Sequence, residues 1–358
     1  QDSNGKNIMG ENAKIFVDNF NRIAGGSDLE EFLSSERTSP TYEGISEKFS
    51  ARIQYNYPTE ESIRTLTGKD IKFSYGVSPG DKDLALGRIR DYWNSLDEVN
   101  RNALNRGVGF LSDEALRAMG EGEGVVGLAN FDGSFFLRAD ERGANFGIFR
   151  HELAHLLQYK LGGVEPEEAQ TLINQMEVLQ ENKNNILDEI QRINLEPPTP
   201  ENEAMKTFLE KNYEENREQY YQLSAHYDVE LDKRVRNSPF VKEWENIAGD
   251  VYKKYTKYGV KGLSELGYID GSPDNVPKYG LIRSYGGTNS LEDMSTFVEE
   301  AVKSPKTFAP LINPESPLYD SIYRNKIEFL YKYKFISDSE YNKILQTAGV
   351  QWTPKSSF

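Results

Sequence analysis

Two of the three histidines in the chain stand four positions apart, in the sequence His151-Glu152-Leu153-Ala154-His155. Apolar residues recur around this segment at the spacing of a helix, at Ile148, Phe149, Leu153, Leu156 and Leu157. A helix turns by about 100° per residue, so both imidazole rings project from one face, one turn apart. Both rings can then reach one zinc ion at about 2.0–2.1 Å. The sequence therefore predicts a metal-binding helix here.

Glu152 stands directly beside the first histidine, where its carboxylate can take a proton from a water molecule bound to the metal. A zinc ion lowers the pKa of such a water towards 7, which makes the water a nucleophile at neutral pH. The pattern HExxH thus indicates metal-dependent hydrolysis of peptide bonds. The competing interpretation is a pair of surface histidines on an ordinary helix.

Composition excludes several other chemistries. The chain has no cysteine, which removes disulfides, thiolate zinc fingers, iron–sulfur clusters and cysteine nucleophiles, so a metal must be held by histidines and carboxylates. No G-x-S-x-G motif occurs, and one histidine outside HExxH argues against a serine triad. With 57 acidic against 42 basic residues, a net charge of −15 and no local basic patch, binding to nucleic acid or to an anionic membrane is disfavoured.

The N-terminal sequence and the hydropathy bear on location. No apolar run reaches the roughly 18 residues that a membrane-spanning helix needs. The chain opens on the polar sequence QDSNGKN, with neither an initiator methionine nor a signal peptide. We take this as a trimmed leader and expect an extracytoplasmic protein, either secreted or tethered to the cell surface.

The 358 residues are enough for two or three folding units at roughly 150 residues each. We expect a leader and a short helix over 1–45, followed by an α+β unit over 46–164 that contains the HExxH helix. Alternating residues predict two strands between 48 and 76, and the apolar spacing over 83–99 predicts a helix. Asp132-Gly133 lies between two β-type runs and predicts a hairpin over 125–140.

The rest of the chain is predicted to be mainly helical. Residues 165–228 carry two apolar stripes at 4/3 spacing, separated by the helix-breaking EPPTP at 196–200, which indicates an inserted antiparallel helical hairpin. The surface of this hairpin is a candidate site for contact with a partner protein. Residues 229–358 form a helical unit with Pro- and Gly-rich loops. The overall expectation is an α+β fold with a mixed sheet.

A catalytic zinc ion needs a third protein ligand and an open position. The extended motif HExxHxxGxxH is not met, because Gln158 and Leu161 stand where the glycine and the third histidine belong. The sequence leaves a carboxylate on a downstream helix or His226 as the third ligand. Further carboxylates that compete for this role are Glu165, Glu168 and Asp228.

The segment SYGGTNSLEDMSTFVEEAV, residues 284–302, supplies a candidate carboxylate. Asn289-Ser290 offers a helix N-cap, and four polar residues then share one helical face. These residues are Glu292, Ser295, Thr296 and Glu299. The arrangement suits a ligand in the first turn of a helix.

HExxH followed by a glutamate on a later helix resembles the gluzincin metallopeptidases. A tyrosine seven residues before that glutamate, as in Tyr285 and Glu292, is similar to the catalytic domain of anthrax lethal factor. The stretch YGGTNSLEDMSTF also resembles the Tyr…Glu-Asp-Phe-Ala-Glu segment of zinc-binding metallopeptidase lipoproteins from gut bacteria. The resemblance implies a zincin-like fold and a zinc endopeptidase acting on proteins or peptides.

The resemblance also implies a role for each matched residue. His151, His155 and Glu292 would hold one zinc ion per chain, Glu152 would be the general base, and Tyr285 would stabilise the oxyanion. Thr296 stands where an acidic residue is common one turn after the ligand, and this threonine or Asp293 would orient the ligands. One strand of the hairpin before HExxH would pair with an extended substrate. The alternative is a surface binding or adaptor protein on the same scaffold, with a structural metal or none.

Overall fold

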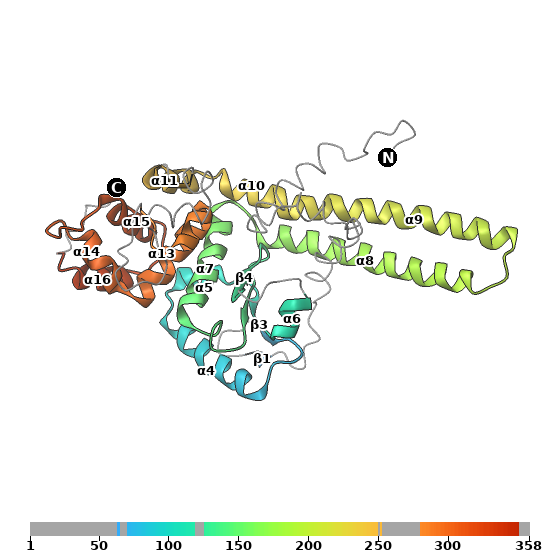
Figure 1. The fold of residues 1–358 in the computed structure, drawn as a ribbon, viewed down its shortest axis with the longest axis horizontal. Helices are drawn as coiled ribbons and strands as arrows, with labels where there is room; N and C mark the ends of the chain where they lie inside the picture. Colours follow the sequence, from blue (N-terminus) through green and yellow to red (C-terminus); the bar gives the residue numbers. More distant parts are fainter. Residues whose placement is uncertain (1–62, 65–69, 119–124, 250, 253–279, 351–358) are drawn as a thin grey trace, which may run out of the picture. The chain divides into compact units, whose positions relative to one another are not determined.

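The computed structural model describes residues 63–64, 70–118, 125–249, 251–252 and 280–350. The protein is an α+β protein, mostly helical with a small mixed sheet (Figure 1). The predicted leader and helix over 1–45 and the predicted strand at 48–57 lie outside the described residues. None of the described helices is both long enough and apolar enough to cross a membrane.

The chain divides into two compact units. The described residues of the first are 167–233, and those of the second fall within 57–166 and 234–358. The HExxH helix and Glu292 both belong to the second unit.

The sheet of the second unit has the strand order β1-β2-β3-β5-β4 in the described part of the chain. Its strands are β1 (Ile63–Arg64), β2 (Asp70–Phe73), β3 (Gly107–Leu111), β4 (Gly127–Ala129) and β5 (Phe135–Arg138). β2, β3 and β5 run parallel, while β1 and β4 are antiparallel to their neighbours. β4 is therefore an edge strand, next to β5.

The predicted hairpin at Asp132-Gly133 is present as β4 and β5. The Asp132 carboxylate accepts hydrogen bonds from the backbone N–H of Ser134 at 3.0 Å and from its hydroxyl at 2.7 Å. Gly133 has φ +80°, a conformation that favours glycine. These contacts turn the chain back so that β4 and β5 pair.

The helices before HExxH differ from the prediction in one place. In the sequence, 83–99 reads as one helix, but α4 (Pro79–Ser95) ends at Ser95 and α5 (Glu98–Ala103) begins three residues later. The break occurs because the Asp97 side chain accepts a hydrogen bond from the Asn100 backbone N–H at 2.9 Å, which caps a new helix. A further helix, α6 (Asp113–Ala118), follows β3.

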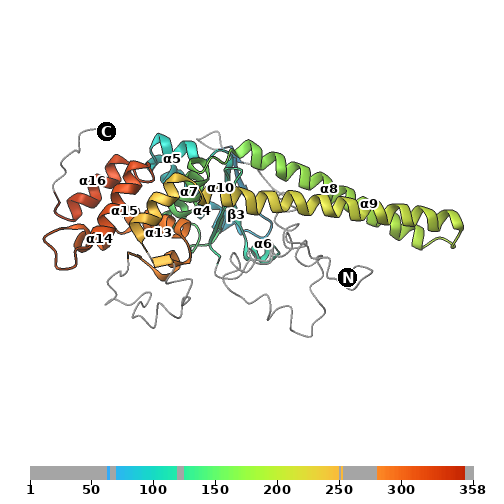
Figure 2. The ribbon, with the colours of Figure 1, turned by 90° about the horizontal axis from the view of Figure 1, so that it is seen from above.

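The first unit contains the predicted helical hairpin. α8 (Pro166–Asn194) and α9 (Pro200–Ala225) run side by side and are joined by the predicted break (Figure 2). A π-helical turn, η1 (His226–Glu230), extends α9 into α10 (Leu231–Arg236). Lys183, which interrupts the apolar stripe of α8, is itself buried, with its ammonium 5.1 Å from the Tyr220 ring.

The described C-terminal residues are helical, as predicted. They form α11 (Pro239–Ala248), the short 3₁₀ turn η2 (Ser284–Thr288), α13 (Ser290–Lys303), α14 (Pro305–Ile312), α15 (Ser321–Lys332) and α16 (Asp338–Thr347). Their core is aromatic: the Trp244 ring meets those of Phe297 and Phe329 edge-on at 5.5 and 5.1 Å. α13 also packs along α7 (Phe146–Leu161), the HExxH helix.

Candidate metal centre

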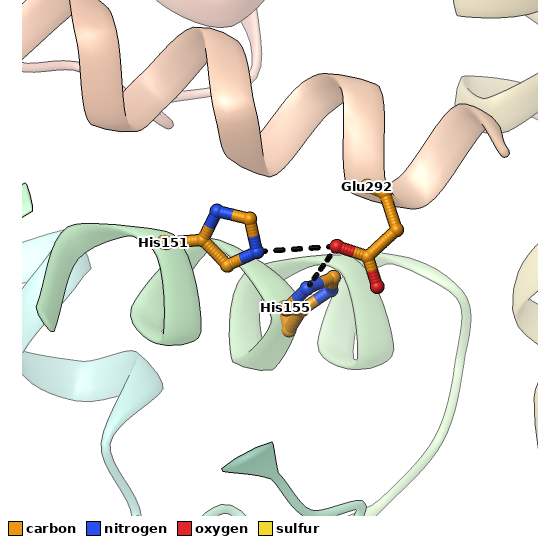
Figure 3. Close-up of side chains that lie close together, drawn as sticks. All are labelled: His151, His155 and Glu292. Atoms are coloured by element: carbon orange, nitrogen blue, oxygen red, sulfur yellow. Dashed lines mark hydrogen bonds and ion pairs between the residues drawn. The ribbon is translucent and has the colours of Figure 1, made fainter. Parts of the chain in front are cut away.

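Two helices of the second unit bring three potential ligands together. His151 and His155 project from α7, and Glu292 reaches them from the first turn of α13 (Figure 3). One oxygen of Glu292, Oε2, lies 3.1 Å from His151 Nε2 and 3.4 Å from His155 Nε2. All three ligand atoms fall within 4.8 Å of one another, so these side chains can hold one metal ion.

Helix caps place these side chains. The Asn145 side chain accepts a hydrogen bond from the Ile148 backbone N–H at 3.0 Å and starts α7. The Asn289 side chain does the same for α13, accepting from the backbone N–H groups of Leu291 at 2.9 Å and Glu292 at 3.0 Å. The predicted N-cap is therefore present, and it fixes Glu292 in the first turn.

The residues that competed for the role of third ligand are not part of this three-residue group within the described chain. His226 Nε2 is 3.9 Å from Glu168 Oε1, and both residues belong to the first unit. Asp228 accepts a hydrogen bond from the Ser224 hydroxyl at 3.3 Å, and Glu165 is exposed. Of the carboxylates and histidines that the sequence left open, the structure brings Glu292 to the two histidines of HExxH.

Gln158 orients His155, a contact that sequence reasoning missed. The His155 Nδ1 atom is 2.9 Å from Gln158 Oε1, on the ring edge opposite to Glu292. The buried Gln158 amide then donates to the Leu291 carbonyl at 2.9 Å and to the Ser295 hydroxyl at 3.1 Å. The glutamine thus fixes both the ring and the distance between α7 and α13. Its position three residues after His155, on the same helical face, was the available signal.

Glu299 stands behind His151 in the same way. Its Oε2 atom is 3.4 Å from His151 Nδ1, and it also pairs with Arg283. The family resemblance implied that Thr296 or Asp293 would orient the ligands. The Thr296 hydroxyl is buried and has no hydrogen-bond partner within the described ranges, while the Asp293 carboxylate bonds to other residues of the helical core. The acidic residue beside a ligand histidine therefore stands one helical turn after Thr296, at Glu299.

The electrostatics of this cluster favour a positive charge at its centre. Burial alone would lower the pKa of His151, but Glu292 and Glu299 raise it to about 10. Burial alone would raise the pKa of Glu292, but the two histidines hold it well below its ordinary value. Two imidazole nitrogens and a carboxylate oxygen in a buried, acidic setting form a donor set that can hold a divalent metal ion.

No protein-family model, curated protein or solved structure matches this chain. The functional interpretation therefore depends on the site itself.

Glu152 lies against the edge strand β4. The side chain is 5% exposed, and a Cβ atom at Gly127 would come within 2.4 Å of its Oε1 atom. The backbone of β4 thus lies directly against the carboxylate, and a side chain at position 127 would force Glu152 to move. Burial raises the pKa of Glu152, and the neighbouring histidines offset this only in part. Of the two hairpin strands left open by the sequence, β4 is the one at the edge.

Tyr285 is brought to the same cluster by η2. Its ring centroid is 6.1 Å from that of His151, and the residue is 52% exposed. Partial burial of the hydroxyl end, with the carboxylates of Glu292 and Glu152 beside it, raises the pKa of Tyr285 well above its ordinary value. The hydroxyl therefore stays protonated and is available as a hydrogen-bond donor beside the ligands.

Proposed function

We propose that this protein is a zinc metallopeptidase of the gluzincin type, an endopeptidase with a zincin-like α+β unit. The observation that carries the proposal is the approach of Glu292 Oε2 to both His151 Nε2 and His155 Nε2. Glu152 on the same helix and Tyr285 in η2 complete the set of side chains that peptide hydrolysis at such a site needs.

Zinc, when bound, supplies a Lewis acid that acidifies a water molecule and polarises a carbonyl group. Glu152 accepts the proton of the attacking water and passes it to the leaving amine. Burial raises the pKa of Glu152, which makes the carboxylate a stronger base towards the attacking water. The carboxylic acid that results can still give its proton to the leaving amine. The protonated Tyr285 donates a hydrogen bond to the carbonyl oxygen as negative charge develops on it.

β4 supports the choice of a peptide as substrate. Within the described chain β4 pairs with β5 alone, so its outer edge offers backbone N–H and C=O groups to an extended segment. Gly127 of this strand touches Glu152, so a peptide paired with β4 passes beside the general base. The net charge of −15 favours the approach of neutral or basic peptides.

The test of this function is metal content together with hydrolysis. We expect about one zinc ion per chain, measured by plasma mass spectrometry on protein purified without added metal. The same protein should cleave members of a peptide library, lose this activity in 1,10-phenanthroline, and regain it when zinc is restored. A chain that binds no zinc after incubation with excess metal would rule the proposal out.

A substitution at Gly127 tests the contact between β4 and Glu152. In a Gly127→Ala variant the added methyl group would overlap Glu152 Oε1, so the carboxylate must move while the ligands stay in place. We expect a fall in kcat of about 10²-fold, the cost of a misplaced catalytic group, at unchanged zinc content.

The matched control is Gly87→Ala in α4, where no atom other than the adjacent residues and the helix's own backbone lies within 4 Å of the added methyl group. This variant should keep the wild-type rate. Equal rates in the Gly127→Ala and wild-type proteins would show that the contact between β4 and Glu152 has no part in catalysis.

A further inference from the structure

A buried polar cluster lies next to Glu292 along α13. We call it the Asp293 cluster, and it consists of Asp293, Lys326, Trp244 and Tyr252. Asp293 and Lys326 are 0% exposed and form an ion pair between α13 and α15. The same carboxylate oxygen accepts hydrogen bonds from the Tyr252 hydroxyl at 2.6 Å and from Trp244 Nε1 at 3.0 Å.

The surroundings of Lys326 make this pair an unusual choice for stability alone. Its ammonium lies 4.7 Å from the Trp244 ring centroid and 4.6 Å from that of Phe297, in the aromatic core. Replacing a buried ion pair with apolar residues of similar volume is often neutral or stabilising, because both charges lose their hydration on burial. The role of this ion pair is therefore better judged from the structural elements that it connects.

On one side the cluster fixes the first turn of α13. Asp293 directly follows Glu292, and their side chains leave the helix about 100° apart. While Glu292 points to the histidines of α7, Asp293 is held from the other side by α15 and by Trp244 of α11. The anchor therefore sets the rotation of the turn that carries Glu292, and with it the position of Glu292 Oε2.

On the other side the cluster holds the segment that carries Tyr285. The Lys326 ammonium donates to the Gly280 carbonyl at 2.6 Å, and Tyr323, also on α15, donates to the Leu281 carbonyl at 2.9 Å. At the other end, Gly286 lies against Asp293, where a Cβ atom would be 3.0 Å from Oδ1. Both ends of the segment 280–286 thus contact the cluster or the helix that supplies its lysine.

We infer that Lys326 and Asp293 are a positioning pair that aligns Glu292 and Tyr285 with the histidines of α7. The inference rests on the proposed function, because only there do these two residues act on a metal ion and a substrate. Neither member of the pair touches the reacting atoms. Their effect passes through the first turn of α13 and through the segment before η2.

The experiment compares metal binding and stability in a double variant, Lys326→Met with Asp293→Asn. This variant removes both charges at nearly constant shape, so no unpaired charge is left in the core. We expect its affinity for Co²⁺ and Zn²⁺, measured by competition with a chelator, to fall by about 10- to 100-fold, as for other residues that orient metal ligands. The visible absorption of bound Co²⁺ should change in shape, while the Tm of the metal-free protein stays within a few degrees of wild type.

The matched control is Lys332→Met, which removes an exposed ion pair between α15 and Glu243 of α11 at 2.8 Å. We expect wild-type metal affinity and an unchanged cobalt spectrum. A double variant with wild-type metal affinity would show that the pair serves folding alone and overturn the inference.

Tyr252→Phe keeps the inference testable if the double variant does not fold. It removes one hydrogen bond to Asp293 and retains both charges. We expect a smaller, several-fold loss of Co²⁺ affinity, and an unchanged affinity would count against the inference. A wild-type chain that binds no Co²⁺ would instead overturn the proposed function, and the inference with it.

Discussion

Replacing Glu152 with glutamine is expected to lower the rate of peptide hydrolysis by about 10²- to 10⁴-fold while zinc content stays at the wild-type level. An amide has the shape of the carboxylate but cannot accept the proton of the attacking water. Glu152 is not among the three converging ligands, so the metal should remain bound. The loss should appear in kcat, because the variant still presents β4 and the metal to the substrate.

The measurement is steady-state hydrolysis of a peptide selected from the library, with zinc measured on the same preparations. Glu300→Gln is the matched control, since Glu300 lies on α13 and accepts a hydrogen bond from the Thr307 hydroxyl at 3.0 Å, away from the ligands. We expect this control to hydrolyse the peptide at the wild-type rate. Normal turnover by the Glu152→Gln protein would show that another group takes the proton, and the mechanism would have to be abandoned.

The parts of the structure that depend on short stretches of sequence were predictable. The HExxH helix follows from apolar spacing around two histidines, and the start of α13 follows from Asn289, whose side chain caps the helix. The helical hairpin follows from its 4/3 spacing and the prolines between α8 and α9. In each case the signal lies in the same stretch of sequence as the element that it predicts.

The parts that depend on pairing between distant residues were predicted less completely. A resemblance was needed to connect Glu292 with the histidines of α7, because spacing alone left His226 and other carboxylates open. Glu299 became recognisable as a partner of His151 only when α7 and α13 were placed together, while Gln158 stands on the same helix as His155 and was overlooked. The partner of Glu299 lies 148 positions earlier in the chain, so no local pattern connects the two residues.

The same limit applies to the sheet and the core. The hairpin predicted β4 and β5 but not which strand forms the edge, because strand order depends on contacts with β3. Lys326 stands in a helix with an amphipathic pattern, where a lysine is ordinarily solvated, yet it is fully buried against Asp293. A charge in an apolar core departs from local patterning, and such departures are frequent near functional sites.

Replacing Glu292 with alanine is expected to abolish stable zinc binding. Two histidines alone offer too few ligands for a catalytic zinc ion, which takes three protein ligands. The loss of affinity should therefore exceed the roughly 10- to 100-fold effect of residues that only orient ligands. Hydrolysis should be lost with the metal, while near-ultraviolet circular dichroism should show a folded chain, since the Asn289 cap and the packing of α13 on α7 remain.

His226→Ala and Glu300→Ala separate this prediction from the alternatives that the sequence left open. His226 lies near Glu168 in the first unit, and Glu300 shares α13 with Glu292 but bonds to Thr307. Both variants should keep about one zinc ion per chain after dialysis, measured by plasma mass spectrometry. Zinc retained by Glu292→Ala and lost by His226→Ala would assign the third ligand to His226. Because Glu292 Oε2 approaches both histidine Nε2 atoms, we expect the opposite result.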